Sequence, residues 1–521
     1  MNMPVVKNPI LPGFHPDPSI CQGEDAYYLV NSTFAYAPGV PLYRSEDLSQ
    51  WEQIGHILAR QSQLPLDGAR VSEGIYAPCI RYHEGTYYMI TTNVSDKGNF
   101  YVTAETPFGP WSEPNYLEEA EGIDPSLYFE GEKCYYIGQR GKANEKFWGD
   151  CEVWIQELDL KEKKLIGEPI ALWDGALKES KWVEGPHLYK KDEYYYILIA
   201  EGGTEYGHSI CIARSKSLFG PYEGSPYNPL FTHRHLGRSY PVQSIGHGDL
   251  VETPDGDWYM VMLGTRPIDG CGPLGRETFI ADVVWEEGWP VVNAGEGKIR
   301  TWQPIKKTAK HEKDERITPQ DAIHITWNKP LDQRLLMLRQ FDTSIFQMNH
   351  EKVTLKMLPQ NLSDLEVPAY IATRLYENRF TAQVSVVATP KEQEEAGLVY
   401  FYNEKNYLRF VIHARASKSI SAGKAASIYL VQDGEEKKLR TISIEGDCHV
   451  LRMEASGLKI SCFIDLREVD FNIDVSGLCP EEAGGFIGCT VGIFATANHN
   501  ESSNSAEFGP LDVNVRTEGI Y

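Results

Sequence analysis

The chain has 521 residues, and 42% of them are hydrophobic, which is enough to bury the cores of two domains. Its 50 basic and 73 acidic residues give a formal net charge of −23, which repels phosphate backbones and anionic membrane surfaces. The composition therefore argues against nucleic acids and membranes as partners and favours a small neutral ligand.

Five similar units follow one another in residues 1–304. In each unit a short loop runs into an apolar strand, and a strand rich in tyrosine or tryptophan follows. The loops lie 47 to 63 residues apart and are HPDPSI at Asp17, YAPCI at Ala77, GIDPSL at Asp124, VEGPHL at Glu184 and IGHGDL at His247. Repeats of this length, built of strands and turns, are typical of a β-propeller with one four-stranded blade per repeat. Residues 1–304 are predicted to form five blades.

Equivalent positions in successive blades face the central channel, so the repeat predicts that Asp17, Asp124, Glu184 and His247 converge there. Three carboxylates at one point oppose each other's ionisation, which indicates catalysis or cation binding. Paired carboxylates across a channel suit glycoside hydrolysis. Glu184 has apolar sequence neighbours and is the predicted general acid, Asp17 is the predicted base, and Asp124 orients Glu184.

Composition changes after the fifth unit. Residues 305–322 are charged and almost free of large apolar side chains, and they are predicted to form a linker. Residues 323–521 contain short, regularly spaced strands with alternating apolar residues, which predicts an antiparallel β-sandwich of the jelly-roll or lectin-like kind. The whole chain is therefore expected to be all-β.

Ten cysteines are scattered singly, and the N-terminal sequence carries no export signal. We therefore expect a cytoplasmic protein whose cysteines are buried free thiols. The sequence leaves the oligomeric state open, with homo-oligomer formation as one alternative.

With these motifs in view, and with STFAYAPGVPLYRSEDLSQW and LGRETF as further matches, the chain resembles the two-domain β-xylosidase/α-L-arabinofuranosidase members of glycoside hydrolase family 43. The resemblance implies that Arg276 contacts the substrate and that Phe34 forms a pocket wall. It also implies that His247 is similar to a channel histidine that holds Ca²⁺ through waters in some members. Tyr76 stands where many relatives have the tryptophan of W-A-P-D, and Phe508 is the candidate for the sandwich aromatic that closes the pocket.

The sequence thus predicts an exo-acting, inverting glycosidase that releases terminal β-D-xylose or α-L-arabinofuranose from xylo- or arabino-oligosaccharides, an activity of xylan degradation. No cofactor is needed for this chemistry, although the sequence is also compatible with a Ca²⁺ ion in the propeller channel. Two alternatives stay open: a propeller that binds sugar without catalysis, and a retaining five-bladed enzyme that acts on fructans. The preferred pentose and the length of the natural substrate are not determined.

Overall fold

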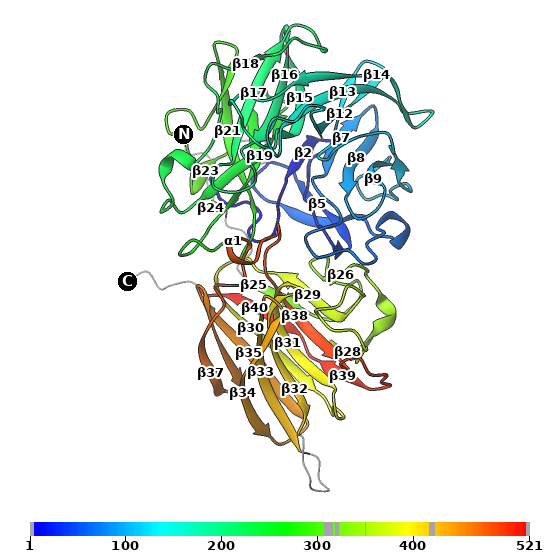
Figure 1. Ribbon diagram of the computed structural model, residues 1–521, viewed down its shortest axis with the longest axis vertical. Helices are drawn as coiled ribbons and strands as arrows, with labels where there is room; N and C mark the ends of the chain where they lie inside the picture. Colours follow the sequence, from blue (N-terminus) through cyan, green and yellow to red (C-terminus); the bar gives the residue numbers. More distant parts are fainter. Residues whose placement is uncertain (1–4, 307–315, 318–321, 350, 416–422, 517–521) are drawn as a thin grey trace.

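The computed structural model describes residues 5–306, 316–317, 322–349, 351–415 and 423–516. A propeller domain and a sandwich domain lie against each other along the long axis of the molecule (Figure 1). Five four-stranded antiparallel sheets succeed one another between residues 19 and 292. The prediction of five blades is confirmed.

The innermost strands of the blades form a closed ring. The strand β2 lies against β7 and β19, and β11 and β15 complete the circle between them. These strands are β2 (Ser19–Gln22), β7 (Cys79–His83), β11 (Ser126–Glu130), β15 (Glu184–Lys191) and β19 (Gln243–Glu252). Residues at the start of each strand are therefore brought around one channel, as the repeat predicted.

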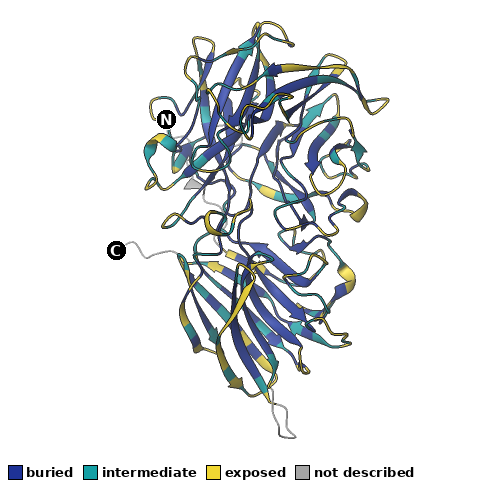
Figure 2. Ribbon diagram, viewed as in Figure 1, coloured by how far each residue is buried: buried dark blue, intermediate teal, exposed yellow. Residues whose placement is uncertain are grey.

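The remaining strands complete each blade outward from the channel. Blade 1 adds β3 (Tyr27–Val30), β5 (Gly39–Ser45) and β6 (Glu52–Leu58); blade 2 adds β8 (Thr86–Asn93), β9 (Gly98–Ala104) and β10 (Asn115–Tyr116); blade 3 adds β12 (Lys133–Gly141), β13 (Cys151–Asp159) and β14 (Lys164–Trp173); blade 4 adds β16 (Tyr194–Glu201), β17 (Ser209–Ser215) and β18 (Glu223–Gly224); blade 5 adds β20 (Trp258–Thr265), β21 (Glu277–Glu286) and β22 (Trp289–Val292). Every residue of β20 is buried, because both faces of a blade pack on its neighbours. The strands of the propeller are mostly dark blue in Figure 2, whereas exposed residues gather in its loops.

A small sheet closes the propeller domain. The strand β1 (Val5–Lys7) pairs antiparallel with β23 (Trp302–Pro304) and parallel with β24 (Arg316–Ile317). Most of the predicted linker, residues 305–322, lies outside the described residues.

The second domain consists of two antiparallel sheets. One sheet has the order β34 (Glu435–Ile444), β33 (Lys424–Gln432), β32 (Asn406–Ala414), β31 (Glu395–Asn403), β38 (Thr490–Thr496), β29 (Ala369–Arg374), β26 (Leu336–Leu338), β4 (Tyr36–Ala37). The other has the order β27 (Phe346–Asn349), β28 (Lys352–Lys356), β39 (Ser505–Phe508), β30 (Arg379–Val387), β35 (Cys448–Ser456), β36 (Lys459–Ile464), β37 (Arg467–Asp474), with β40 (Leu511–Val515) joining β30 to β25 (Ala322–Ile325).

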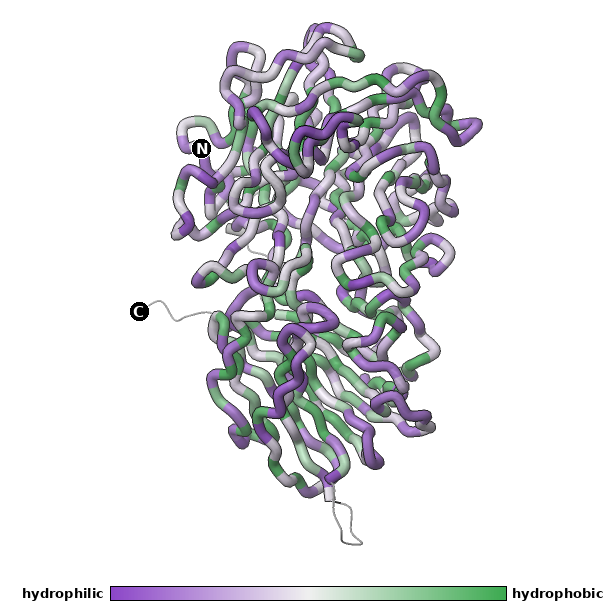
Figure 3. The backbone as a smooth tube through the Cα atoms, in the orientation of Figure 1, coloured by the Kyte–Doolittle hydropathy of each residue, from purple (hydrophilic) through white to green (hydrophobic). Residues whose placement is uncertain are grey.

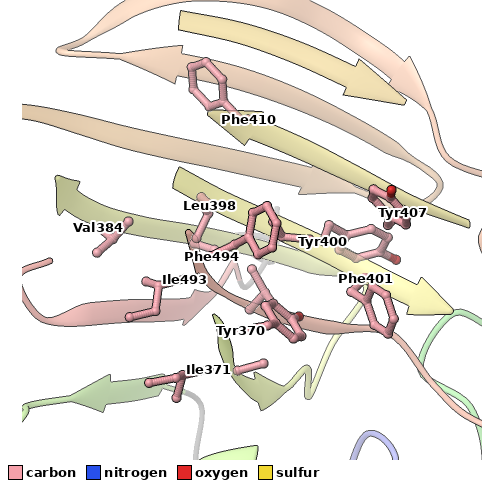
Figure 4. Close-up of a cluster of buried hydrophobic side chains, with 14 of the residues drawn as sticks. Tyr370, Ile371, Val384, Leu398, Tyr400, Phe401, Tyr407, Phe410, Ile493 and Phe494 are labelled. Atoms are coloured by element: carbon pink, nitrogen blue, oxygen red, sulfur yellow. The ribbon is translucent and has the colours of Figure 1, made fainter. Parts of the chain in front are cut away.

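Alternating side chains separate the two faces of these sheets. Along β30 every second residue from Phe380 is buried, as expected of a sheet with one face on a core and one in water. Hydrophobic and hydrophilic residues accordingly follow one another closely along the backbone tube (Figure 3). Leu398, Tyr400 and Phe410 lie on the face of their sheet that packs against the other sheet, where the ring of Tyr400 stacks on Phe380 of β30 at 6.2 Å (Figure 4).

The propeller contributes a strand to the sandwich. The strand β4 belongs to blade 1 by sequence but pairs with β26, so that Tyr36 lies opposite Leu338. Beside it the buried guanidinium of Arg339 donates to the carbonyl of Ala69 at 2.7 Å and to Glu404 at 2.6 Å. These contacts place the sandwich against the propeller in a defined orientation.

Helices in the described part of the chain are single turns: α1 (Pro480–Ala483) at the junction of the domains, and the 3₁₀ turns η1 (Gln61–Gln63), η2 (Arg234–Leu236) and η3 (Thr343–Ile345). None of them is long and apolar enough to cross a membrane. All ten cysteines are free thiols, and nine are buried, with Cys448 exposed. The prediction of free thiols is therefore confirmed, and that of burial holds for all but one.

Candidate active site

Irregular backbone aims the predicted residues into the channel. Asp17 and Asp124 lie two residues before the first residue of β2 and of β11, with φ of 51° and 54°, and His247 has φ of 46°. Glu184 begins β15, where the register with β16 shifts, and the next residue is Gly185 at φ of 57°. Left-handed conformations and bulges of this kind cost free energy and cluster at functional sites. The structure therefore brings Asp17, Asp124, Glu184 and His247 together, as the repeat predicted.

Both carboxylate oxygens of Asp17 are held. Arg276 Nη1 donates to Oδ1 at 2.6 Å, and the hydroxyl of Ser32 donates to Oδ2 at 2.6 Å. The side chains of Asp17 and Arg276 are 7% and 9% exposed, so this ion pair is nearly dry. A carboxylate oriented by two charged or polar donors suits a general base, since its lone pairs are aimed in advance.

Asp124 and His247 form a second pair, with Asp124 Oδ2 3.9 Å from His247 Nδ1. Burial raises the pKa of Asp124 to about 6, with His247 opposing the increase and Asp17 adding to it. At neutral pH Asp124 therefore carries a negative charge for most of the time, close to the other carboxylates.

Glu184 is the carboxyl group that the channel keeps protonated. Burial raises its pKa well above the ordinary value, and the charges of Asp124 and Asp17 raise it further. Within the described residues its carboxyl group forms no hydrogen bond to the protein, which leaves its proton available for a ligand. A buried carboxyl group with neighbouring negative charge is the environment of a general acid.

Aromatic rings form one wall of the site. The ring centroids of Phe34 and Tyr76 lie 5.2 Å apart, and Phe486 stacks on Phe34 at 6.3 Å. The guanidinium carbon of Arg276 lies 5.7 Å and 5.9 Å from the centroids of Phe34 and Phe486. Phe34, Tyr76 and Arg276 thus lie together, and flat apolar rings beside polar groups are typical of sugar sites.

The prediction for Phe508 is wrong. Phe508 is fully buried in β39, where it pairs with Val353 and Val386 inside the sandwich core, so it cannot line an open pocket. The sandwich aromatic at the site is Phe486, which is 40% exposed and whose carbonyl accepts from Arg276 Nη2 at 3.2 Å. The glycines of AGGFIG were the available signal, because a hydrophobic residue between glycines indicates a loop.

A buried carboxylate that sequence reasoning missed ties the blades together around the channel. Asp249 accepts hydrogen bonds from Ser19 Oγ at 2.7 Å, Arg81 Nη1 at 2.9 Å and the hydroxyl of Tyr189 at 2.6 Å. Burial opposes its ionisation, but Arg81 and these donors hold its pKa below the usual range. Asp249 therefore links strands of blades 1, 2 and 4 to blade 5, and its place in IGHGDL was the available signal.

A cavity of about 700 Å³ opens beside Arg276 and Phe486. The loop Thr204–Gly207 of blade 4 forms one side, and the sandwich segment around α1 forms another. Its lining mixes polar groups such as Gln243 with apolar ones, which suits the part of an oligosaccharide that extends beyond the carboxylates.

Comparison with known proteins assigns each of the two domains to a known family. Residues 6–290 match the family Glycosyl hydrolases family 43, and residues 327–514 match the beta xylosidase C-terminal concanavalin A-like domain, in agreement with the predicted lectin-like sandwich. The chain is 45% identical over 524 residues to a xylosidase/arabinosidase of Butyrivibrio fibrisolvens, covering 98% of this chain and 99% of that protein.

Two further relatives share both domains. A non-reducing end alpha-L-arabinofuranosidase of Bacteroides ovatus is 35% identical, with 97% of this chain and 94% of that protein covered. The crystal structure of xylan beta-1,4-xylosidase from Bacillus halodurans C-125 superimposes with a TM-score of 0.89 at 32% identity, with 98% of this chain and 100% of that chain covered.

Proposed function

Since the chain belongs to glycosyl hydrolases family 43 and is a glycosidase, we propose that it removes single terminal pentoses from xylo- or arabino-oligosaccharides with inversion at the anomeric carbon. The proposed sugars are β-D-xylose and α-L-arabinofuranose, because its relatives are named as a xylosidase/arabinosidase and an alpha-L-arabinofuranosidase. A neutral oligosaccharide also agrees with the net charge of −23.

One observation carries the proposal: the channel gives its carboxyl groups different surroundings. Burial and neighbouring charge keep the proton on Glu184, whereas Arg276 and Ser32 hold Asp17 as an oriented acceptor. An enzyme that cleaves a glycosidic bond by single displacement needs a proton donor and an oriented proton acceptor at once.

The proposed reaction is a single displacement. Glu184 gives its proton to the glycosidic oxygen as the bond from that oxygen to the anomeric carbon breaks. Asp17 takes a proton from the water that attacks the anomeric carbon from the opposite face. Asp124 raises the proton affinity of Glu184, and the next exchange with water returns both carboxyl groups to their starting states.

The exo mode follows from the wall that Phe486 builds. This residue comes from the sandwich but stacks on Phe34 of the propeller, so the aromatic wall spans both domains. A pocket bounded on that side accepts a chain end rather than the middle of a polymer. Early release of long oligosaccharides from xylan or arabinan would contradict this mode.

The proposed function is tested by two measurements. Hydrolysis of aryl β-D-xylopyranoside and aryl α-L-arabinofuranoside, assayed side by side, gives the preferred pentose. Proton NMR of the first sugar released should show the anomer opposite to that of the substrate. The substituted enzyme Asp17→Asn should lose hydrolysis of both substrates, and a retained anomer would refute the inverting mechanism and the role of Asp17.

We also propose that a hydrated Ca²⁺ ion binds beside His247. The His247 ring makes no hydrogen bond within the described chain and faces Asp124 at 3.9 Å. Those same residues hold no group of three or more His, Cys, Asp or Glu side chains placed to share a metal ion. Such an ion would therefore keep most of its waters and would offset the repulsion between the carboxylates.

Chelation should then reduce the rate only in part, and added Ca²⁺ should restore it. The control is His247→Ala, which should make the remaining activity insensitive to the chelator. An unchanged rate after exhaustive chelation, together with impairment in His247→Ala, would refute the ion and assign the histidine to the sugar or the carboxylates.

A further inference from the structure

Two cysteines from different domains meet at the junction beside the active site. Cys271 lies in the propeller loop after β20, and Cys479 precedes α1 in the sandwich. Both thiols donate to the same carbonyl oxygen, that of Ser476, at 3.5 Å and 3.2 Å. Each thiol is also among the groups that shift the pKa of the other. Among the described cysteines, this is the pair whose sulfur atoms contact one common atom.

The pair sits behind the residues that bound the pocket. Gly270 and Pro480, the immediate neighbours of the two cysteines, both line the 700 Å³ cavity. The backbone N–H of Gly272 donates to Glu481 Oε2 at 2.8 Å, which already couples the two segments. The same segments continue to Arg276 and Phe486, whose contact closes one side of the site.

We propose that Cys271 and Cys479 are an oxidative modification site, at which a low-molecular-weight disulfide converts the two thiols into a disulfide bond between propeller and sandwich. The sulfur atoms must approach to about 2 Å, which the side chains reach by rotating away from the shared carbonyl oxygen. The kinetic consequence given below rests on the proposed function, whereas formation of the bond does not.

The chemistry is thiol–disulfide exchange in two steps. The thiolate of Cys271, which is 6% exposed where Cys479 is fully buried, attacks one sulfur of the small disulfide and releases the first small thiol. The thiolate of Cys479 then attacks Cys271 Sγ, and the second small thiol leaves. Two electrons and two protons pass from the cysteines to the oxidant. Burial raises the pKa of both thiols, so the reaction should be faster at alkaline pH.

The bond would act on stability and on the cavity. A cross-link between residues 271 and 479 closes a long loop in the unfolded chain, and we expect the unfolding midpoint to rise by about 5 °C. It would also draw two walls of the cavity together. The KM for a pentose tetrasaccharide should rise severalfold, while the KM for an aryl pentoside stays unchanged.

The test uses the full chain with the exposed Cys448 changed to Ser. The protein is incubated with oxidised glutathione at mildly alkaline pH, alkylated and digested without reduction by trypsin and a protease that cuts after glutamate. Cleavage at Glu481 and Glu482 separates Cys479 from Cys489, whose thiol donates to Leu478. Mass spectrometry should find the peptides of Cys271 and Cys479 linked, and dithiothreitol should release them.

Matched variants decide the assignment. Cys271→Ser and Cys479→Ser should each abolish the linked peptide, whereas Cys489→Ser should keep it. A bond between Cys479 and Cys489, a stable mixed disulfide on Cys271, or thiols that remain fully alkylatable after oxidation would each overturn the proposal. Absence of pentosidase activity in the reduced protein, with the linked peptide still formed on oxidation, would refute the proposed function and leave the disulfide site standing.

Discussion

The channel assigns different tasks to chemically similar side chains through their surroundings. Glu184 has no hydrogen-bond donor within the described residues and lies near two other carboxylates, so its neutral form is favoured. Asp17 has two donors at 2.6 Å, so it is held as an oriented acceptor. Two substitutions test this division of tasks.

Replacing Glu184 by Gln removes the proton donor and keeps the shape of the side chain. Glycosides with poor leaving groups should lose about 10²–10⁴ in kcat, because their oxygen must be protonated as the bond breaks. Aryl glycosides with acidic phenols should be largely spared. The control is Glu193→Gln, an exposed residue of the same blade, which should change neither rate. Equal loss on both substrate classes would remove Glu184 from the acid role.

Replacing Asp124 by Asn removes one of the negative charges that raise the pKa of Glu184. The folded-state pKa of Glu184 should fall, so its proton is lost at lower pH. In the pH profile of kcat/KM, the alkaline limb should therefore move to lower pH. Asp96→Asn, in the turn between β8 and β9, is the control and should leave the limb in place. An unmoved limb in Asp124→Asn would refute the electrostatic coupling.

At the scale of elements, a loop and a strand of the sandwich place two phenylalanines in opposite roles. The loop between α1 and β38 exposes Phe486 at the pocket, whereas the alternation of β39 turns Phe508 into the core. The glycines on both sides of Phe486 indicate a loop, but the sequence around Phe508 does not say on which face of a strand that ring lies. The strand pairing of β39 decides that face.

Phe486→Ala should raise the KM for pentosides and leave the urea midpoint nearly unchanged, because the ring is 40% exposed. Phe508→Ala should lower the free energy of unfolding by about 3–5 kcal/mol and leave the KM of the folded fraction unchanged. Steady-state kinetics and urea denaturation of both variants check this reciprocal pattern. A reversed pattern would return Phe508 to the pocket.

At the scale of the whole molecule, buried polar contacts join the two domains. Arg339 has no exposed side-chain surface and reaches Ala69 of the propeller as well as Glu366 and Glu404 of the sandwich. Glu404 in turn accepts from the backbone N–H of Val71 at 2.8 Å. Removing Arg339 would leave this carboxylate, whose side chain is only 12% exposed, without its cation.

Arg339→Ala should therefore destabilise the protein by about 3–5 kcal/mol. Calorimetry should show the two domains melting at separate temperatures, because the contact between them is weakened. Arg440→Ala, at an exposed position of β34, is the matched control and should change the free energy of unfolding by less than about 0.5 kcal/mol. A single transition at the original temperature in Arg339→Ala would show that other contacts carry the interface.

The sequence by itself determined the features that repeat or alternate. The five loops predicted the blades and the convergence of Asp17, Asp124, Glu184 and His247, because equivalent positions in a propeller share one channel. Period-two alternation predicted the sandwich, because residues on one face of a strand share one environment.

Only the tertiary structure decided which residues from distant segments meet. It puts Phe486, and not Phe508, at the pocket. It also places Asp249 in contact with three other blades and pairs β4 with a sheet of the sandwich. It also brought Cys271 and Cys479 to one carbonyl oxygen. Such contacts depend on how two independently patterned domains dock, and no period within either domain's sequence encodes the orientation between them.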